Sequence, residues 1–339
     1  MDSAKILATL SAKAERLAPG GGAIEGLRQL SGGASMETWL FDVSGNGHSE
    51  KLILRREPDD RSADGRGIGL LREAALIAHV NKAQVPVPQI RHIFAPEDGI
   101  GTALVMTFIA GEALPQRIMR DPHHASAREA YARNAGHILA EIHALDWQNL
   151  GLPLQQPAAM VADLESRYRQ TSIRRPVFEY AFRWLADNMP PPVGQPTLVH
   201  GDFRTGNLML GPDSIIGVLD WEVCHVGDPV EDLAWLCMPS WRFGALDKPV
   251  GGIGQFADLE NAYTAASGRR IDPARFRFWS IVSLLRWGGM CADMGQWVLD
   301  GVDRSLERHV IARRASETEL DLLVALDVRR SLDGGIADA

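Results

Sequence analysis

Apolar and polar residues alternate in short runs along the first third of the chain, whereas further on the apolar residues recur at helical spacing. The alternating runs predict strands at about 24–30, 37–43, 51–56, 90–94 and 103–108. A helix is expected before the first of these strands, and another at about 67–81. Later positions predict helices at about 125–146, 158–170, 173–189, 229–237, 255–267, 273–298 and 303–328, with three short strands between the third and fourth helices. Strands followed by helices are typical of an α+β protein with two lobes.

Composition supports a folded protein with a sizeable apolar core, since 45% of the 339 residues are hydrophobic and 23% are charged. The formal net charge of -8 disfavours nucleic acid and anionic membranes as partners. Cys224, Cys237 and Cys291 lack Cys-x-x-Cys spacing, which predicts buried thiols instead of disulfides or a zinc site. Charged residues interrupt the apolar positions of residues 1–17, so we expect neither a signal peptide nor a membrane span, and a cytoplasmic location.

The most informative segment is 198–220, where two apolar strands each lead into polar residues. The first leads into HGDFRTGN at 200–207, and after the second the chain reaches Asp220. An ionised carboxylate after an apolar run is costly to bury unless a cation or hydrogen-bond donors receive it. Magnesium takes hard oxygen ligands, and one carboxylate and one amide oxygen can supply its protein ligands. We therefore predict Asn207 and Asp220 as magnesium ligands.

The spacing of Asp202 and Asn207 equals that of the protein-kinase catalytic loop, in which an aspartate receives the substrate hydroxyl proton. Gly201 stands where that loop has arginine. Together with Asp-Trp-Glu at 220–222 and GDPVEDLA at 227–234, the segment resembles the aminoglycoside phosphotransferase-like family, which includes choline, homoserine and fructosamine kinases.

This resemblance implies a two-lobed protein-kinase-like fold, with 1–110 as the nucleotide-binding lobe and 111–339 as a helical lobe that carries the catalytic loop and the acceptor site. It also implies a kinase that moves the γ-phosphoryl group of ATP or GTP, with Mg²⁺, onto the hydroxyl group of a small molecule. Asp202 would be the base. Neither a nucleic acid nor a membrane is expected as a partner.

The resemblance extends to a glycine-containing segment of the first lobe, which looks like the family's loop over the nucleotide phosphates. Glycines permit close approach of the backbone, and a serine hydroxyl can donate to a phosphate oxygen. A hairpin turn would show the same residues, so the position in the family order carries this interpretation. The phosphate-contacting residues implied are Ser31, Gly32, Gly33 and Ser35.

An arginine stands where kinases have the strand lysine that contacts the α- and β-phosphates. This residue is Arg55 or Arg56, and Glu73 occupies the place of its helix partner. The branch that resembles the N-terminal part of acyl-CoA dehydrogenase fusion proteins shares the Leu-Arg sequence. A guanidinium is permanently charged and forked, so it would hold phosphates in a different geometry from lysine.

The acceptor is less well defined by the sequence than the nucleotide site. Thr107, Phe108 and Ile109 resemble the hinge whose backbone groups meet the adenine edge. The segment Trp241-Arg242-Phe243-Gly244 interrupts a helix and lies near the motif in the sequence, and it is our best prediction for an acceptor contact. The family admits aminoglycosides, macrolides, choline-like alcohols, homoserine and hydroxyacyl thioesters as acceptors.

Several polar residues near the motif have a structural explanation that we favour over a catalytic one. His200 suits a packing and hydrogen-bonding role, Asp228 suits an N-cap before Pro229, and His143 suits a satisfied core histidine. Asp232 would face back toward the catalytic loop and brace it. Two further residues are open between a functional and a structural role, Arg204 and Glu222.

Two other functions are compatible with these residues. The arginine at the lysine position raises the alternative of a nucleotide-binding, pseudokinase-like protein without catalysis. A metal-dependent hydrolase would use His200, Asp202, Asp220 and His225, and this is the weaker alternative.

Overall fold

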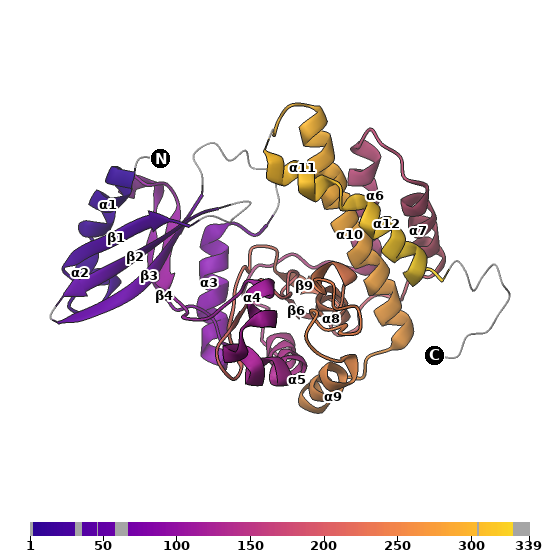
Figure 1. Cartoon of the computed structure of the whole chain (residues 1–339), viewed down its shortest axis with the longest axis horizontal. Coiled ribbons are helices and arrows are strands. Elements are labelled where there is room, and N and C mark those ends of the chain that lie inside the picture. Colours follow the sequence, from indigo (N-terminus) through magenta and orange to yellow (C-terminus); the bar gives the residue numbers. More distant parts are fainter. Residues whose placement is uncertain (1–2, 31–35, 46, 58–66, 304, 328–339) are drawn as a thin grey trace. The chain divides into compact units, whose positions relative to one another are not determined.

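A computed structural model gives the fold of the protein, and it describes residues 3–30, 36–45, 47–57, 67–303 and 305–327 (Figure 1). These residues form two compact units, each discontinuous in sequence. Unit 1 comprises Met1–Ala127, Leu145–Leu152 and Gly206–Cys224, and unit 2 comprises Arg128–Ala144, Pro153–Thr205 and His225–Ala339. The predicted division into lobes at residues 110 and 111 stays a prediction.

Unit 1 is built on a five-stranded antiparallel sheet with the order β1-β2-β3-β5-β4. The strands are β1 (Ala23–Gln29), β2 (Glu37–Gly45), β3 (His48–Arg56), β4 (Ile90–Phe94) and β5 (Ala103–Thr107). All five strand predictions from the sequence are confirmed.

Helices cover both faces of this sheet. Successive side chains of a strand point to opposite faces, so the strands present apolar side chains to the helices on both sides. One face packs against α1 (Ser3–Ser11) and α2 (Ala14–Leu17), which contribute Ile6, Leu10 and Leu17 to the core (Figure 1). The other packs against α3 (Leu70–Val80), where Leu70 and Ala74 contact strand residues. The short helices of unit 1 are η1 (Asn81–Ala83), η2 (Pro96–Asp98), α4 (Pro115–Arg120) and η3 (Pro122–His124).

A hairpin from the middle of the chain also belongs to unit 1. It consists of β7 (Leu208–Leu210) and β8 (Ile215–Val218), which pair antiparallel. The amide of Val218 donates to the carbonyl of Pro86 at 2.8 Å. Glu112 and Leu210 each donate their backbone amide to the other's carbonyl at 2.9 Å. These bonds join the hairpin to the segments on either side of β4 and β5.

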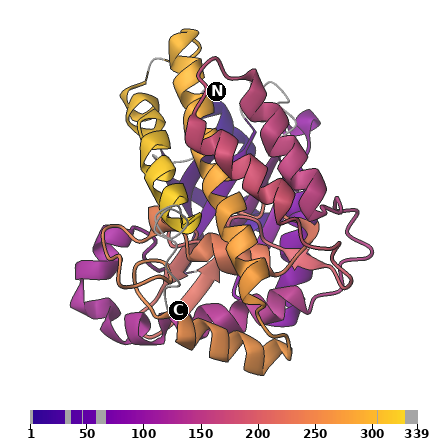
Figure 2. The same cartoon turned by 90° about the vertical axis from the view of Figure 1, so that its right-hand side faces the viewer.

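Unit 2 is mainly helical, with α10 (Pro273–Leu299) packed against its neighbours (Figure 2). Several of its helices have proline in the first turn. Proline suits this position because a backbone amide there would have no hydrogen-bond partner within the helix. The other elements are most of α5 (Ala125–His143), α6 (Pro157–Gln170), α7 (Pro176–Asp187), α8 (Val230–Leu236), η4 (Pro239–Trp241), α9 (Phe256–Ser267), α11 (Leu306–Ala312), α12 (Ala315–Ala325), and the paired strands β6 (Thr197–Val199) and β9 (His225–Gly227).

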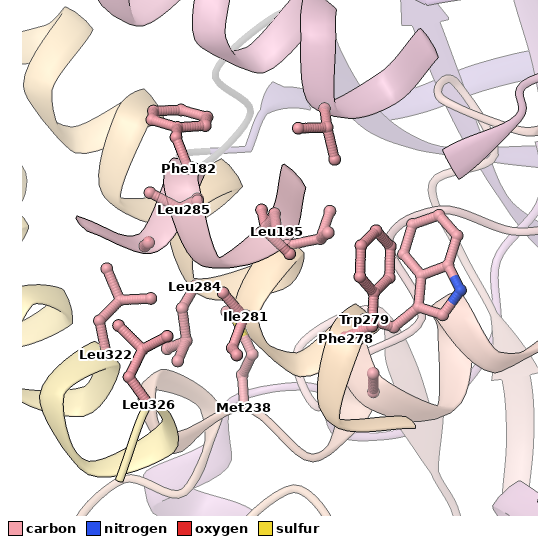
Figure 3. Close-up of a cluster of buried hydrophobic side chains, with 14 of the residues drawn as sticks. Phe182, Leu185, Met238, Phe278, Trp279, Ile281, Leu284, Leu285, Leu322 and Leu326 are labelled. Atoms are coloured by element: carbon pink, nitrogen blue, oxygen red, sulfur yellow. The ribbon is translucent and has the colours of Figure 1, made fainter. Parts of the chain in front are cut away.

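The apolar core of unit 2 lies along α10. Figure 3 shows Leu284 and Leu285 among side chains from α7 and α12, including Phe182 and Leu322. Burial of each large apolar side chain stabilises the fold by about 1.5–3 kcal/mol relative to exposure. This core positions α8, which supplies side chains to the site described below.

The structure differs from the prediction in several elements. The single helix expected before the first strand is two helices, α1 and α2. The helix expected at 303–328 is two helices, α11 and α12, separated at Arg313 and Arg314. Arg314 stacks on the ring of Trp287 at 5.6 Å and donates to the carbonyl of Ser240, contacts that apolar spacing cannot reveal. Four short strands, β6 to β9, occupy the region where three were expected.

The cysteines agree with the sequence prediction, because all three are buried free thiols. Burial raises the pKa of the Cys237 thiol to about 12. Within the described ranges, no helix has the length and apolar character needed to cross a membrane.

Candidate functional site

The predicted catalytic loop begins in unit 2 directly after β6. His200 is fully buried, and its Nδ1 accepts a hydrogen bond from the amide of Asp202 at 3.1 Å. This contact agrees with the packing role expected for His200. Gly201 has a φ of 80°, in the left-handed region that favours glycine. An arginine at this position, as in the protein-kinase loop, would be strained.

Asp232 on α8 braces this loop, as expected from the sequence. Its buried carboxylate accepts the amides of His200 at 2.8 Å and Gly201 at 2.9 Å. It also contacts Nε2 of His143 at 3.2 Å, while Nδ1 of that histidine contacts the hydroxyl of Tyr263 at 2.9 Å. Burial alone would raise the pKa of Asp232, but the hydrogen bond and charge of His143, with smaller contributions from His200, lower it. His143 is therefore a satisfied core histidine.

The carboxylate of Asp202 is held by two side chains of unit 2. Trp235 donates from Nε1 to Oδ1 at 2.7 Å, and Arg204 donates from Nε at 3.0 and 3.2 Å to the two carboxylate oxygens. The Arg204 guanidinium stacks on Trp241 at 4.7 Å. Sequence analysis did not connect Trp235 with Asp202. The position of Trp235 three residues after Asp232 on α8 was the available signal, since residues three apart share a helix face.

Thr205 anchors the end of the loop. Its buried hydroxyl lies 2.7 Å from the hydroxyl of Tyr131 and donates to the carbonyl of Gly251 at 3.1 Å. A Cβ at Gly251 would lie 2.1 Å from the Thr205 hydroxyl oxygen, so only glycine fits this turn. Neither Tyr131 nor Gly251 was singled out from the sequence, because both are far from the motif along the chain.

Asn207 and Asp220 occupy one end of the hairpin in unit 1. Asn207 directly precedes β7, Asp220 follows β8 by two residues, and Leu208 pairs with Val218 between them. The amide of Leu219 donates to the carbonyl of Asn207 at 2.8 Å. Asp220 has a φ of 68°, a left-handed conformation that costs on the order of 1 kcal/mol for a residue other than glycine.

Arg55 on β3 joins this end of the hairpin to α3. Its Nη1 donates to Oε1 of Glu73 at 2.5 Å, and its Nη2 lies 3.4 Å from Oδ1 of Asp220. Burial by itself would lower the pKa of Arg55, but the nearby carboxylates, led by Glu73, raise it above its usual value. Glu222 adds to this negative field, and its carbonyl accepts the amide of Ile68 at 2.7 Å.

The adjacent Arg56 has a different role, because neighbouring strand residues point to opposite faces. Arg55 shares the α3 face with Ile53. The fully buried Arg56 instead donates to Glu37 at 2.7 Å and to the carbonyl of Ile100 at 3.1 Å. Of the two arginines considered from the sequence, Arg55 is the one beside Glu73 and the hairpin.

The hinge-like segment runs from β5 past the hairpin. The amide of Thr107 donates to the carbonyl of Gln89 at 3.0 Å, and the amide of Phe108 donates to the carbonyl of Lys51 at 3.1 Å. Both amides are therefore engaged in backbone hydrogen bonds next to the sheet. Ile109 contacts β8, since a Cβ at Gly217 would lie 2.6 Å from its Cδ1. The predicted phosphate-loop residues lie outside the described part of the chain: Ser31, Gly32, Gly33 and Ser35.

Asn207 and Asp220 fit a magnesium ion better than a transition metal. Both are hard oxygen donors, and Mg²⁺ commonly takes one or two protein ligands beside phosphates and water. Among the residues that the structure describes, no cluster of three or more His, Cys, Asp and Glu side chains could hold a metal. His225, proposed for a hydrolase centre, instead contacts Glu231 through Nε2 at 3.1 Å. These contacts give the hydrolase alternative no support.

Comparison with family models matches residues 26–279 to the APH phosphotransferase enzyme family. The chain belongs to this family. The predicted resemblance and the predicted α+β, kinase-like fold are both confirmed.

Relatives of this APH chain include much longer proteins. Acyl-CoA dehydrogenase family member 10 of Mus musculus is 29% identical over 62% of the chain and 20% of its own length. Acyl-CoA dehydrogenase family member 11 of Homo sapiens is 30% identical over 70% of the chain and 33% of its own length. The chain thus spans a third or less of these two curated relatives. The predicted similarity to this branch is confirmed.

Solved structures share the APH fold over nearly the whole chain. An aminoglycoside phosphotransferase-like protein from Ralstonia eutropha JMP134 has a TM-score of 0.73 and 23% identity, covering 96% of this chain and 98% of that one. A choline/ethanolamine kinase family protein from Mesorhizobium loti has a TM-score of 0.61 and 18% identity, covering 93% of each. A thermostable mutant of the aminoglycoside phosphotransferase APH(4)-Ia, in complex with AMP-PNP and hygromycin B, has a TM-score of 0.61 and 16% identity, covering 95% of this chain and 99% of that one.

Proposed function

We propose that this APH family member is a small-molecule kinase that transfers the γ-phosphoryl group of ATP or GTP to a substrate hydroxyl. The observation that carries the proposal is the position of Arg55, which contacts both Glu73 and Asp220. A cation paired to a helix glutamate beside a metal-binding aspartate is the arrangement that phosphoryl transfer uses to hold the nucleotide phosphates.

Asp202 is the proposed base. Its two donors, Trp235 and Arg204, hold the carboxylate in one orientation and stabilise its charge. An oriented carboxylate can align an acceptor hydroxyl and receive its proton as the bond to phosphorus forms. Asp232 and Thr205 keep the backbone on both sides of this residue in place.

Arg55 is the proposed contact of the nucleotide phosphates. Its charge is permanent and its planar fork suits paired oxygen atoms, so it can take the place of the usual lysine. Glu73, which is buried, orients the guanidinium. When Mg²⁺ is bound, it neutralises charge on the phosphate oxygens, and Asn207 and Asp220 would be its protein ligands.

The proposed adenine contact is the backbone of the hinge-like segment. The amides of Thr107 and Phe108 are used in the sheet. The amide of Ile109 has no hydrogen-bond partner among the described residues, which makes it the donor we propose for the base. The glycine-containing segment at 31–35 keeps its proposed role over the phosphates.

Two findings from the comparisons support a nucleotide as phosphoryl donor and a small molecule as acceptor. The APH(4)-Ia neighbour binds AMP-PNP together with hygromycin B. The family description is that of a phosphotransferase. The dehydrogenase activity named for the longer relatives is not part of the proposal, because the matched regions are a third or less of those two proteins.

A transfer assay tests this function. The chain is incubated with ATP or GTP, Mg²⁺ and a panel of alcohols, sugars, antibiotics and hydroxyacyl thioesters, and product phosphate esters are detected by mass spectrometry. Transfer to one acceptor class that is lost in Asp202→Asn supports the kinase. Thermal stabilisation by nucleotide without any transfer would instead support the nucleotide-binding alternative, for which the arginine at position 55 is the specific argument.

A further inference from the structure

Unit 2 contains a pocket of about 340 Å³ that is lined by three arginines. Arg269 and Arg270 follow α9, and Arg275 lies in the first turn of α10. None of the residues proposed for catalysis, metal or nucleotide binding lines this pocket. Its volume lies within the range of about 300–1,000 Å³ that is usual for small-molecule sites.

The charge of the pocket is unbalanced. Among the described residues that line it, Asp228 is the one acidic residue, and it is already engaged by Arg275 and by Nε1 of Trp279. Its Oδ1 also accepts the amide of Val230, the first residue of α8, at 3.1 Å; the N-cap position itself is taken by Pro229, one residue later than expected from the sequence. Three guanidinium groups against one carboxylate leave two positive charges in excess.

The arginines retain donors for a ligand. Among the described residues, Arg269 makes one long side-chain bond, from Nη1 to the carbonyl of Gln195 at 3.4 Å. Arg270 is exposed, and it has no hydrogen-bond or ion-pair partner in the described part of the chain. Each guanidinium carries five N–H donors in a fork that matches phosphate oxygens.

The rest of the wall is largely apolar. Val193, Val230 and Ile271 line it together with the buried ring of Tyr263. Such a surface accommodates an apolar group next to the charged one. We propose that this pocket binds a phosphate monoester of a small apolar molecule. A monoester carries close to two negative charges at neutral pH, which matches the excess of two positive charges.

Isothermal titration with phenyl phosphate at constant ionic strength tests this proposal on the full chain. The test variant is the double substitution Arg269→Gln/Arg270→Gln, with the single variant Arg270→Gln beside it. Arg313→Gln is the matched control, because Arg313 is also exposed and lies in unit 2 outside the pocket. The thermal midpoint of each variant reports that the fold is intact.

We expect the dissociation constant to rise about tenfold or more in the double variant and by a smaller factor in Arg270→Gln, since each guanidinium supplies charge-assisted bonds. Arg313→Gln should bind like the wild type. Inorganic phosphate, which lacks the ring, and benzoate, which carries one charge, should both bind more weakly than phenyl phosphate.

Several outcomes would overturn the proposal. They are no binding to the wild type, an unchanged dissociation constant in the double variant, and an equal loss in Arg313→Gln, which would indicate general screening. Benzoate binding as tightly as phenyl phosphate would overturn the assignment to a phosphate. None of these results depends on phosphoryl transfer, so they stand apart from the test of the proposed function.

Discussion

Arg55 and Glu73 form an ion pair that joins β3 to α3, with 2.5 Å between Nη1 and Oε1. Glu73 is fully buried, so the guanidinium both neutralises it and holds it against the strand. Asp220 lies 3.4 Å from the same guanidinium. One arginine therefore connects a helix, a strand and the hairpin of unit 1.

Replacing this arginine by lysine should weaken nucleotide use more than folding. Arg55→Lys keeps the charge that Glu73 requires but loses the fork that also reaches Asp220. We expect kcat/KM for ATP to fall about tenfold, which corresponds to about 1.4 kcal/mol. The matched control is Arg91→Lys, which alters the partly exposed Arg91–Glu50 pair on the same sheet. Equal effects of the two substitutions would contradict a phosphate role for Arg55.

Removal of the proposed base should abolish most turnover. Asp202→Asn keeps the size of the side chain, but an amide cannot take the proton from the hydroxyl group of the substrate, so kcat should fall about 10²–10⁴-fold. Nucleotide affinity, measured by thermal shift, should stay near that of the wild type. Asp213→Asn, at the exposed turn between β7 and β8, is the control. A variant that retains half of its activity would remove Asp202 from the mechanism.

Magnesium dependence should identify the metal ligands. Asn207→Ala removes an oxygen ligand, and Asp220→Asn removes the negative charge of one, so each variant should raise the Mg²⁺ concentration for half-maximal turnover by about tenfold or more. Asparagine tolerates the left-handed backbone at position 220, so the first variant should fold. The measurement is turnover against Mg²⁺ at fixed nucleotide. Curves that superimpose on the wild type would exclude both residues as ligands.

The indole of Trp235 should act on the rate and not on binding. Trp235→Phe retains an aromatic ring but removes the 2.7 Å bond to Asp202. Loss of one hydrogen bond to a charged group corresponds to about 1.5–3 kcal/mol, so we expect kcat to fall about tenfold or more with KM unchanged. Trp184→Phe, on α7, is the control. A change confined to KM would assign Trp235 to the acceptor site and not to positioning.

Stability should depend on Asp232 in a pH-dependent way. Because its folded pKa is lowered below the ordinary value of 3.8, its contribution is fully present above that value and is lost as the pH falls through the folded pKa. Asp232→Asn cannot accept the amides of His200 and Gly201 as well, so it should cost about 3–5 kcal/mol at pH 7. Chemical denaturation should show this difference shrinking below about pH 4. A constant difference at all pH values would contradict an ionised Asp232.

Features that depend on neighbours along the chain were predicted well. Alternation of side chains identified β1 to β5, and the period of the apolar residues identified α5 to α10. Spacing singled out Asp202 and Asn207, and the apolar strand before it singled out Asp220; the family match confirms the resemblance that these motifs suggested. The roles of these three residues stay predictions.

Features that depend on distant segments required the tertiary structure. Alternation placed Arg55 and Arg56 on opposite faces, but only the packing of α3 shows which face carries Glu73. The contact of Trp235 with Asp202 and the pocket around Arg269 likewise join segments dozens of residues apart. The sequence by itself determined most of the elements and the motif, because backbone preference and side-chain period are local. The tertiary structure decided the partner of each charge, because partners meet only when the elements pack.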